Sequence, residues 1–425
     1  MVLVVAPELK ICKVREIVTQ AAGTEPDMLR RKSRIFSTED ARRLARRRLP
    51  RLVFDYVDGA AGREAGAARN QARFDDILLQ PRAMADVAER SLDVVLLGEE
   101  YGLPFGIAPM GMCNLVCLGA DQRLAEAARA FRLPVCLSSA GSSPLEDMRT
   151  WAGDKAWFQL YFGRSEEASL AAVDRAQTAG YETLVLTVDV PQVSRRVRDV
   201  RNGFTMPFRI SPRVFWDFAT HPRWAIATLM SGAPSPQNFG AKDEEFKFDR
   251  NASRAGADWG FLEKLRDRWP GKLIVKGITS QSDARRVQSL GADAIYVSNH
   301  GARQLDSVPP AIDLLPLIRS TVGPDYPLIF DSGLRNGEDV VKALALGADF
   351  VMLGRPVLLA LGAEGGSGLT ALLNCFVEDI SNAMAQIGAK SIAGLGPELI
   401  FTNAPVAVDE TKSGNSATLQ IATKS

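Results

Sequence analysis

Lys272-Leu-Ile-Val-Lys276, a helical pattern over Ser280–Leu290 and Ala294-Ile-Tyr-Val-Ser-Asn299 follow one another along the chain. Two short apolar runs rich in β-branched residues, joined by an amphipathic helix, are typical of a βαβ unit with parallel strands. The same alternation extends outward from this unit in both directions. We expect eight strands in all, over Pro104–Ala108, Pro134–Ser138, Ala156–Tyr161, Thr183–Asp189, Lys272–Lys276, Ala294–Asn299, Leu328–Asp331 and Phe350–Gly354.

Helical patterns follow most of these strands. Eight β/α units predict an α/β fold of the TIM (β/α)8 barrel type, whose active site lies at the C-terminal ends of the strands. An open, doubly wound sheet is the alternative. The expected helices cover Asp121–Phe131, Glu166–Ala179, Ser280–Leu290, Pro310–Val322, Gly337–Leu346 and a closing segment near Thr370–Ile387.

Three segments lie outside the regular alternation. Residues 1–36 are expected to form an N-terminal extension, and the polar residues 403–425 a flexible tail. The barrel domain then covers 37–402 and starts with a helix, because Ser37-Thr-Glu-Asp40 is a capping sequence and Pro50 cannot continue a helix. About eighty residues separate Asp189 from Lys272, which indicates an insertion at about 204–257.

The insertion contains an aromatic-rich stretch, Val214 to Met230, followed by polar sequence. A lid, a contact surface, a disordered loop or a helix in a membrane interface would each share this composition. The N-terminus lacks the basic region of a signal peptide, and no apolar run reaches the roughly 20 residues that a membrane span needs.

The chain has 425 residues, 46% of them hydrophobic and 24% charged, with 51 Lys and Arg against 50 Asp and Glu. This composition is typical of a soluble globular protein, and a net charge of +1 argues against a nucleic-acid partner. Only two His and five Cys are present, with no Cys-x-x-Cys, so no metal site is expected. The odd, scattered cysteines indicate reduced thiols in the cytoplasm.

Polar residues gather at the predicted strand ends, which indicates an active site. His300 follows the sixth strand and is the candidate general base, because imidazole titrates near neutral pH. Asp189, after the fourth strand, would fix the tautomer of the ring, with helix capping as its alternative role. The other histidine, His221, lies in the insertion, where a surface or packing role is expected.

Arginines and glycines near the same strand ends indicate anion binding. Arg196 and Arg303 offer planar guanidinium groups that match a carboxylate, although Arg196 could instead form surface salt bridges. Gly333 and Gly354-Arg355 follow strands seven and eight, where many TIM barrels bind a phosphate group. A phosphate-bearing cofactor is therefore expected.

At these residues the sequence resembles the FMN-dependent 2-hydroxy acid dehydrogenase/oxidase family, from about Ser37 to Ala404. Its pattern is most similar to that of the (S)-mandelate dehydrogenases and the flavin-type L-lactate dehydrogenases. The motifs that carry the resemblance are Ser298-Asn-His-Gly-Ala-Arg-Gln-Leu-Asp306, Phe158-Gln-Leu-Tyr161, Leu186-Thr-Val-Asp189, Val275-Lys-Gly277, Asp331-Ser-Gly333 and Lys342-Ala-Leu-Ala-Leu-Gly347.

The resemblance implies oxidation of a mandelate- or lactate-like (S)-2-hydroxy acid to the 2-oxo acid, with FMN as cofactor. His300 would be the general base, paired with Asp189, with Tyr161 facing the reacting hydroxyl and Arg303 beside it. Hydride transfer and carbanion formation both remain open as mechanisms. The implied substrate binders are Tyr56, Tyr161, Arg196, Arg303 and Gly111. The implied FMN binders are Pro109, Ser138, Gln159, Thr187, Lys276 beside flavin N1, Ser298, Asp331, Gly333, Arg335, Gly354 and Arg355.

Four positions depart from the family pattern. Met110 replaces a common Thr after Ala108-Pro109, and Asn336 replaces a second Arg, which would weaken phosphate binding or only remove a surface charge. Gly111 and Ala140 are small where some relatives carry larger residues, which favours a mandelate-like or longer substrate over glycolate.

The insertion resembles that of membrane-associated members through His221-Pro-Arg-Trp224. This implies a dehydrogenase that passes electrons to a quinone, with an oxidase using O₂ as the alternative. Peripheral attachment to the inner face of the membrane stays open beside a cytoplasmic location. A homotetramer is implied by the resemblance alone.

Two other classes of function remain open at this point. An aldolase-type barrel could use Lys276 to form a Schiff base. A binding or scaffold protein could keep the barrel without its chemistry. An amine or a modified peptide as substrate also stays open.

Overall fold

The structure is a computed structural model that describes residues 33–206, 208–239 and 253–402. Eight parallel strands close into a barrel in the order β10-β3-β4-β5-β6-β7-β8-β9, which confirms the predicted TIM barrel. All eight predicted strands form, with ends shifted by at most two residues. They are β3 (Phe105–Met110), β4 (Val135–Ser138), β5 (Ala156–Leu160), β6 (Thr183–Thr187), β7 (Lys272–Ile278), β8 (Ala294–Val297), β9 (Leu328–Phe330) and β10 (Phe350–Leu353).

A hairpin that the sequence pattern did not predict precedes the barrel. Strands β1 (Val94–Leu96) and β2 (Glu99–Tyr101) pair antiparallel. The Tyr101 ring lies with its centroid 6.4 Å from Trp157 and 5.5 Å from Phe350, in the cluster of side chains inside the barrel. The hairpin therefore packs against the interior of the barrel. In a TIM barrel the ligand site is expected at the C-terminal ends of the strands.

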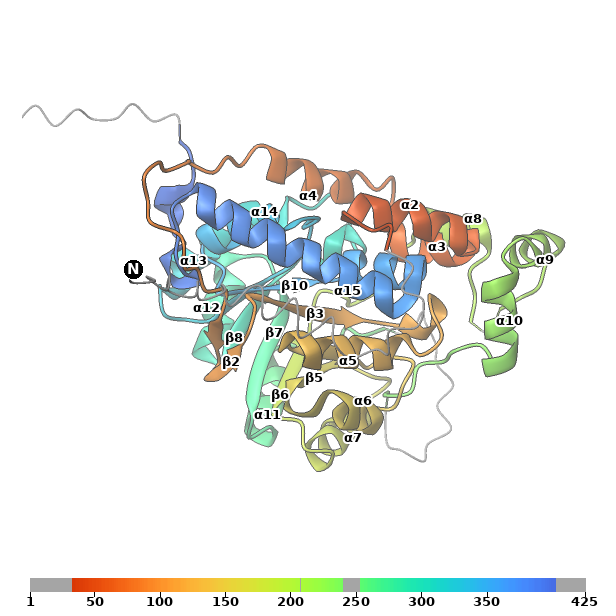
Figure 1. The fold of residues 1–425 in the computed structure, drawn as a ribbon. Helices are drawn as coiled ribbons and strands as arrows, with labels where there is room; N and C mark the ends of the chain where they lie inside the picture. The colour runs from red at the N-terminus through yellow and green to blue at the C-terminus, as the bar shows by residue number, and fades with distance from the viewer. Residues whose placement is uncertain (1–32, 207, 240–252, 403–425) are drawn as a thin grey trace, which may run out of the picture.

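Helices cover the outside of the barrel (Figure 1). The predicted first helix is confirmed, because the Ser37 side chain accepts a hydrogen bond from the Asp40 backbone N–H at the start of α2. Helices α3, α4, α6 and α11 were not predicted. The bounds are α2 (Thr38–Arg48), α3 (Arg51–Asp58), α4 (Ala65–Asp75), α5 (Ala120–Phe131), α6 (Leu145–Ala152), α7 (Glu166–Thr178), α11 (Trp259–Arg268), α12 (Gln281–Ser289), α13 (Ala311–Val322) and α14 (Gly337–Ala345).

The closing helix is longer than expected, because α15 covers Arg355–Gln386 instead of starting near Thr370. Its glycines lower helix propensity, and the helix kinks at Glu364 and Gly365. Tertiary packing overrides the propensity, since a Cβ at Gly362 would lie 2.7 Å from Leu49 at the end of the adjacent α2. α15 is the one described helix long and apolar enough to cross a membrane, but 72% of its most apolar window is buried inside the molecule. It therefore packs as a core helix.

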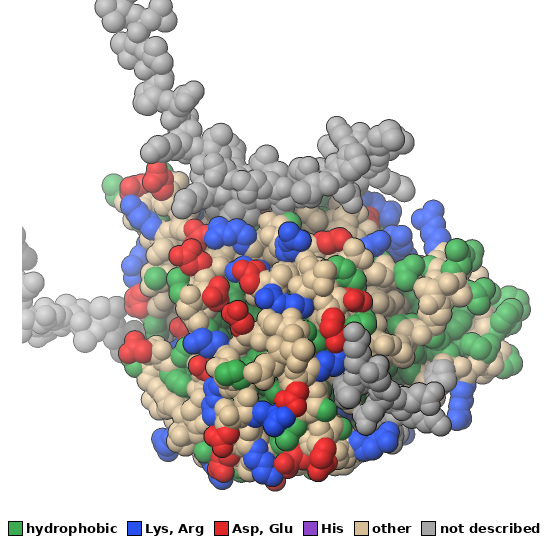
Figure 2. Space-filling view, turned by 90° about the horizontal axis from the view of Figure 1, so that it is seen from below, with side chains coloured by type: hydrophobic (Ala, Val, Ile, Leu, Met, Phe, Trp, Pro, Cys, Tyr) green, Lys and Arg blue, Asp and Glu red, His purple; other side chains and the backbone are tan. Residues whose placement is uncertain are grey.

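Helix α8 (Val197–Asn202) precedes the insertion and packs against α3. The described part of the insertion forms α9 (Pro212–Ala219) and α10 (Pro222–Ser231), which project from the barrel at the right edge of Figure 1. Large apolar side chains on α9 and α10 are exposed, and they form the green area at the right of Figure 2. The predicted tail at 403–425, most of the N-terminal extension and residues 240–252 of the insertion lie outside the described residues.

Candidate active site

His300 and Asp189 form the pair that the sequence predicts. The His300 Nδ1 lies 3.0 Å from the Asp189 Oδ1. Asp189 fits there because Gly277 has no side chain, and a Cβ at this position would lie 2.6 Å from the Asp189 Cβ. Burial raises the pKa of Asp189, but His300 and Lys276 outweigh this effect and hold the pKa below its ordinary value. An ionised carboxylate at Nδ1 orients the ring and stabilises its protonated form.

The backbone at His300 is strained. Residues His300, Gly301 and Ala302 have φ angles of +56°, +60° and +57°, a region that costs free energy for a side chain other than glycine. Hydrogen bonds hold this turn, because the His300 N–H donates to the Ser298 hydroxyl at 3.0 Å and the Gly301 N–H to the Ser332 hydroxyl at 3.0 Å. The turn therefore sets the position of the imidazole.

Lys276 is a buried cation at the end of β7, with 3% of the residue exposed. Its Nζ donates to the Ser298 hydroxyl at 2.7 Å and lies 3.4 Å from the Asp331 Oδ2. Ser298 and Tyr296 in turn donate to Asp331 at 2.6 and 2.8 Å. Buried charges are stable when they are paired and hydrogen-bonded in this way. The network holds the ammonium group beside the cavity.

Two buried polar atoms near Lys276 have no hydrogen-bond partner among the described residues, the Gln159 Nε2 and the Thr187 Oγ1. The Ser138 hydroxyl donates to the Gln159 Oε1 at 2.7 Å and so fixes the amide. Thr187 is the strand neighbour of Lys276. Because unsatisfied buried polar groups are costly, these atoms indicate a polar ligand at this floor of the barrel.

Two arginines lie close together at the other end of the cavity. Burial and the charge of the neighbouring Arg335 lower the pKa of Arg355 to about 10. Burial also lowers the pKa of Arg335. Gly354 precedes the first turn of α15, and a helix N-terminus attracts anions. Two adjacent guanidinium groups at a helix N-terminus form a site for a phosphate group.

Tyr56 on α3 forms a wall of the cavity. Its hydroxyl donates to the Gly111 carbonyl at 3.3 Å, and its ring stacks on Phe204 with centroids 4.7 Å apart. The guanidinium carbons of Arg196 and Arg303 lie 5.2 and 5.6 Å from the centroid of this ring. The structure thus brings both predicted anion-binding arginines to one side chain.

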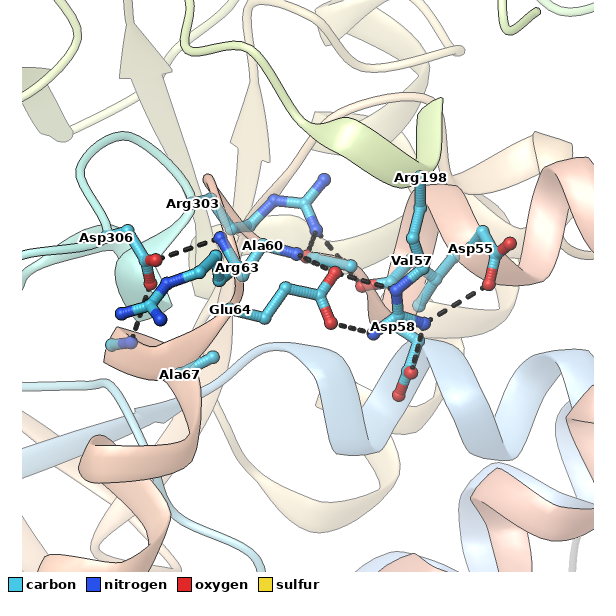
Figure 3. A network of polar contacts seen from close by, with 12 residues as sticks. Asp55, Val57, Asp58, Ala60, Arg63, Glu64, Ala67, Arg198, Arg303 and Asp306 are labelled. Atoms are coloured by element: carbon cyan, nitrogen blue, oxygen red, sulfur yellow. Dashed lines mark hydrogen bonds and ion pairs between the residues drawn. The ribbon is translucent and has the colours of Figure 1, made fainter. Parts of the chain in front are cut away.

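Both arginines also have protein partners. The Arg196 Nε lies 3.0 Å from the Asp199 Oδ2. This ion pair differs from the surface salt bridge expected as the alternative, because the two side chains are only 10% and 4% exposed. Arg303 donates to backbone carbonyls at the end of α3, including that of Gly59 at 2.7 Å. Figure 3 shows this contact beside the ion pairs of Arg198 that hold α3, α8 and the start of α4 together.

A cavity of about 1460 Å³, including its open mouth, joins these groups. Five of the predicted residues do not line it: Ser138, Gln159, Thr187 and Ser298 are buried, and the Asp189 side chain is 13% exposed. The other predicted residues line it: Tyr56, Pro109, Gly111, Tyr161, Lys276, Arg196, His300, Arg303, Asp331, Gly333, Arg335, Gly354 and Arg355.

Arg254 also lines this cavity and was not predicted. It lies near the end of the polar part of the insertion, where no local sequence signal marks it. Ser332 was not predicted either, although the quoted motif after β9 contains it. His221 lies away from the cavity, directly before α10, with its Nδ1 2.6 Å from the Asp217 carbonyl oxygen, as expected for a packing residue.

A family model described as FMN-dependent dehydrogenase matches residues 45–402. The chain belongs to the FMN-dependent dehydrogenase family. An (S)-mandelate dehydrogenase of Pseudomonas putida is 38% identical over 86% of this chain and 94% of its own length. An L-lactate dehydrogenase of Haemophilus influenzae is 36% identical over 86% of this chain and 98% of its own length.

Solved structures of FMN-dependent dehydrogenase relatives share the fold. The crystal structure of a monotopic membrane protein, (S)-mandelate dehydrogenase, has a TM-score of 0.83 and 38% identity, covering 87% of this chain and all of that one. A mandelate oxidase structure has a TM-score of 0.72 and 34% identity, covering 84% of this chain and 97% of that one.

Family membership makes the protein a flavoprotein oxidoreductase that uses FMN. The site fits this cofactor, because the unsatisfied Gln159 and Thr187 atoms and the Lys276 ammonium suit a polar ring edge. The paired Arg335 and Arg355 suit a phosphate. The aldolase and scaffold alternatives are therefore set aside.

Proposed function

We propose that this enzyme oxidises a mandelate- or lactate-like (S)-2-hydroxy acid to the corresponding 2-oxo acid. The observation that carries the proposal is the His300–Asp189 pair, 3.0 Å apart, in a cavity that also contains Arg196 and Arg303. Relatives named (S)-mandelate dehydrogenase and L-lactate dehydrogenase support this substrate class.

His300 would remove a proton from the substrate with its Nε2, while Asp189 holds the tautomer and stabilises the imidazolium. Arg196 and Arg303 would bind the substrate carboxylate. The Tyr56 ring and the Gly111 carbonyl would limit where this carboxylate can lie. Burial and the nearby Asp189 raise the pKa of Tyr161, so its phenol stays protonated and can donate to the substrate oxygen.

FMN, when bound, supplies the two-electron acceptor that the side chains lack. Lys276 would place positive charge at the ring edge where negative charge develops on reduction. Arg335 and Arg355 would bind the phosphate. Further contacts would come from Pro109, Ser138, Gln159, Thr187, Ser298, Asp331, Gly333 and Gly354.

The test is anaerobic reduction of the flavin. We expect the purified yellow protein to bleach with (S)-mandelate or (S)-lactate. His300→Ala should slow bleaching by at least about 100-fold and keep the yellow colour, because it removes the base and leaves the cofactor site. Asp189→Asn should also slow the reaction.

Arg285 on α12 supplies the control, because its side chain is exposed and does not line the cavity. Arg285→Met should bleach at the rate of the unmodified protein. If His300→Ala bleached as fast as the unmodified protein, the assignment of His300 as the general base would be wrong. Failure of every 2-hydroxy acid to bleach the unmodified protein would reject the proposed reaction.

We further propose a dehydrogenase that attaches peripherally to the inner face of a membrane and passes electrons to a quinone. The exposed apolar side chains of α9 and α10 support this, as does the relative described as a monotopic membrane protein. An oxidase using O₂ is the second candidate, supported by the similarity to mandelate oxidase. Rapid peroxide formation by a protein that does not bind membranes would favour the oxidase.

A homotetramer is the proposed assembly.

A further inference from the structure

Arg254 places a third guanidinium group at the substrate end of the cavity. Its guanidinium carbon lies 5.0 Å from the centroid of the Tyr161 ring and 5.9 Å from that of Phe239. Arg196 and Arg303 instead lie over Tyr56. The three arginines thus line the cavity beside two different aromatic side chains, Tyr56 and Tyr161.

Close backbone packing sets the position of Arg254. Its N–H donates to the Pro191 carbonyl at 2.9 Å, which ties it to the loop after β6. Two residues later, a Cβ at Gly256 would lie 2.3 Å from the Phe162 ring, so only glycine allows the backbone to approach this closely. Phe162 is itself fixed by an edge contact with Phe261 at 5.0 Å. These contacts hold the loop against the residue that follows Tyr161.

The other cations of the cavity have roles in the proposed reaction. Arg335 and Arg355 would bind the phosphate of FMN, and Lys276 is paired with Asp331. The first carboxylate of the substrate would bind to Arg196 and Arg303, the arginines that lie over Tyr56. Arg254 lies over Tyr161 instead, where a second anionic group of the substrate could meet it.

We infer that Arg254 binds a second carboxylate at the far end of the substrate, so that the preferred substrate is a 2-hydroxy dicarboxylic acid. This inference rests on the proposed function. Gly111 and Ala140 both line the cavity, and their small size leaves more room for the substrate chain than larger side chains would. A guanidinium group pairs well with a carboxylate in a partly buried site.

The test compares (S)-2-hydroxyglutarate with (S)-2-hydroxypentanoate, which has the same five-carbon chain and a methyl group in place of the distal carboxylate. The readout is the ratio of kcat/KM for the two acids, measured with the holoenzyme. We expect the unmodified protein to prefer the dicarboxylate, and Arg254→Met to lower the ratio about 30-fold through loss of a charged hydrogen bond. Arg254→Lys should retain part of the preference, and the control Arg285→Met all of it.

One further variant keeps the guanidinium group, and one further measurement needs no turnover. Gly256→Ala keeps Arg254 but pushes its loop away from Phe162, so it should also lower the ratio. Calorimetry with 2-oxoglutarate and 2-oxopentanoate should show weaker binding of the dicarboxylate to Arg254→Met.

An equal preference for both acids in the unmodified protein, or the same ratio in Arg254→Met, would overturn the inference. Reduction of the flavin by monocarboxylates alone would overturn it while leaving the proposed function intact. If neither class of acid reduces the flavin, the proposed function fails and this inference fails with it.

Discussion

Asp58, the last residue of α3, accepts hydrogen bonds from Arg42 at 2.7 Å and from Arg198 at 2.8 Å. These contacts connect α2, α3 and α8, and Figure 3 shows the contact between Asp58 and Arg198. Burial raises the pKa of Asp58, but the two arginines outweigh it and lower the pKa from 3.8 to about 2. Asp58 therefore stabilises the fold above the unfolded pKa, and this contribution is lost as the pH falls towards 2.

Asp58→Asn tests this contribution. At pH 7 we expect the variant to be less stable by about 2 kcal/mol, the free energy that corresponds to the shift in pKa. The difference from the unmodified protein should narrow between about pH 4 and about pH 2, where the aspartate becomes protonated. Urea unfolding at several pH values measures it. Asp75→Asn, at an exposed residue of α4, is the control, and a pH-independent difference would contradict the prediction.

The N-terminus of α15 combines a helix end with a buried arginine, Arg355, whose pKa is lowered to about 10 by burial and by Arg335. A bound phosphate would relieve the repulsion between these two guanidinium groups. Arg355→Met should weaken FMN binding about 10- to 100-fold through loss of a charge-assisted hydrogen bond.

Titration of the apoprotein with FMN, followed by quenching of flavin fluorescence, measures this loss. Riboflavin lacks the phosphate, so its affinity should differ little between Arg355→Met and the unmodified protein. If Arg355→Met lost as much affinity for riboflavin as for FMN, Arg355 would not be a phosphate-binding residue.

The start of α14 explains one departure from the family pattern. Asn336 accepts a hydrogen bond from the Asp339 backbone N–H at 2.9 Å and caps the helix. Its side chain is exposed and does not line the main cavity. Asparagine is a favoured N-cap residue, so this position has a structural role that an arginine would not fill.

At the scale of the whole molecule, α9 and α10 present an apolar surface that projects from the barrel (Figures 1 and 2). Trp216, Leu229 and Met230 are 67%, 85% and 84% exposed. The helix pair is nevertheless anchored, because Asp217 accepts from the Arg51 N–H at 2.9 Å and the Trp224 indole donates to the Leu115 carbonyl at 2.8 Å. A firmly attached apolar surface suits a membrane interface.

The double variant Leu229→Ser and Met230→Ser should reduce binding to phospholipid vesicles at least about tenfold, because each side chain loses apolar contact with lipid. Co-sedimentation with vesicles measures the bound fraction. Leu317→Ser removes a half-exposed leucine from α13, on the other side of the molecule, and should leave binding unchanged. Equal binding of the double variant and the unmodified protein would argue against this surface.

Much of the fold and the pairing at its centre could be predicted from the sequence. Each barrel strand is a short apolar run with its own periodicity, and the eight strands close in one order because βα units pack side by side. That rule also brings residues after β6 and β8 to one rim, so Asp189 and His300 could be paired without a structure.

Other features depend on contacts between distant segments, and only the tertiary structure decided them. The β1–β2 hairpin packs against the barrel interior, and the glycine-rich start of α15 is helical because it packs on α2. Arg254 reaches the cavity because Gly256 lies against Phe162. Local sequence carries little information about such contacts, since their free energy comes from side chains that meet only after the chain has folded.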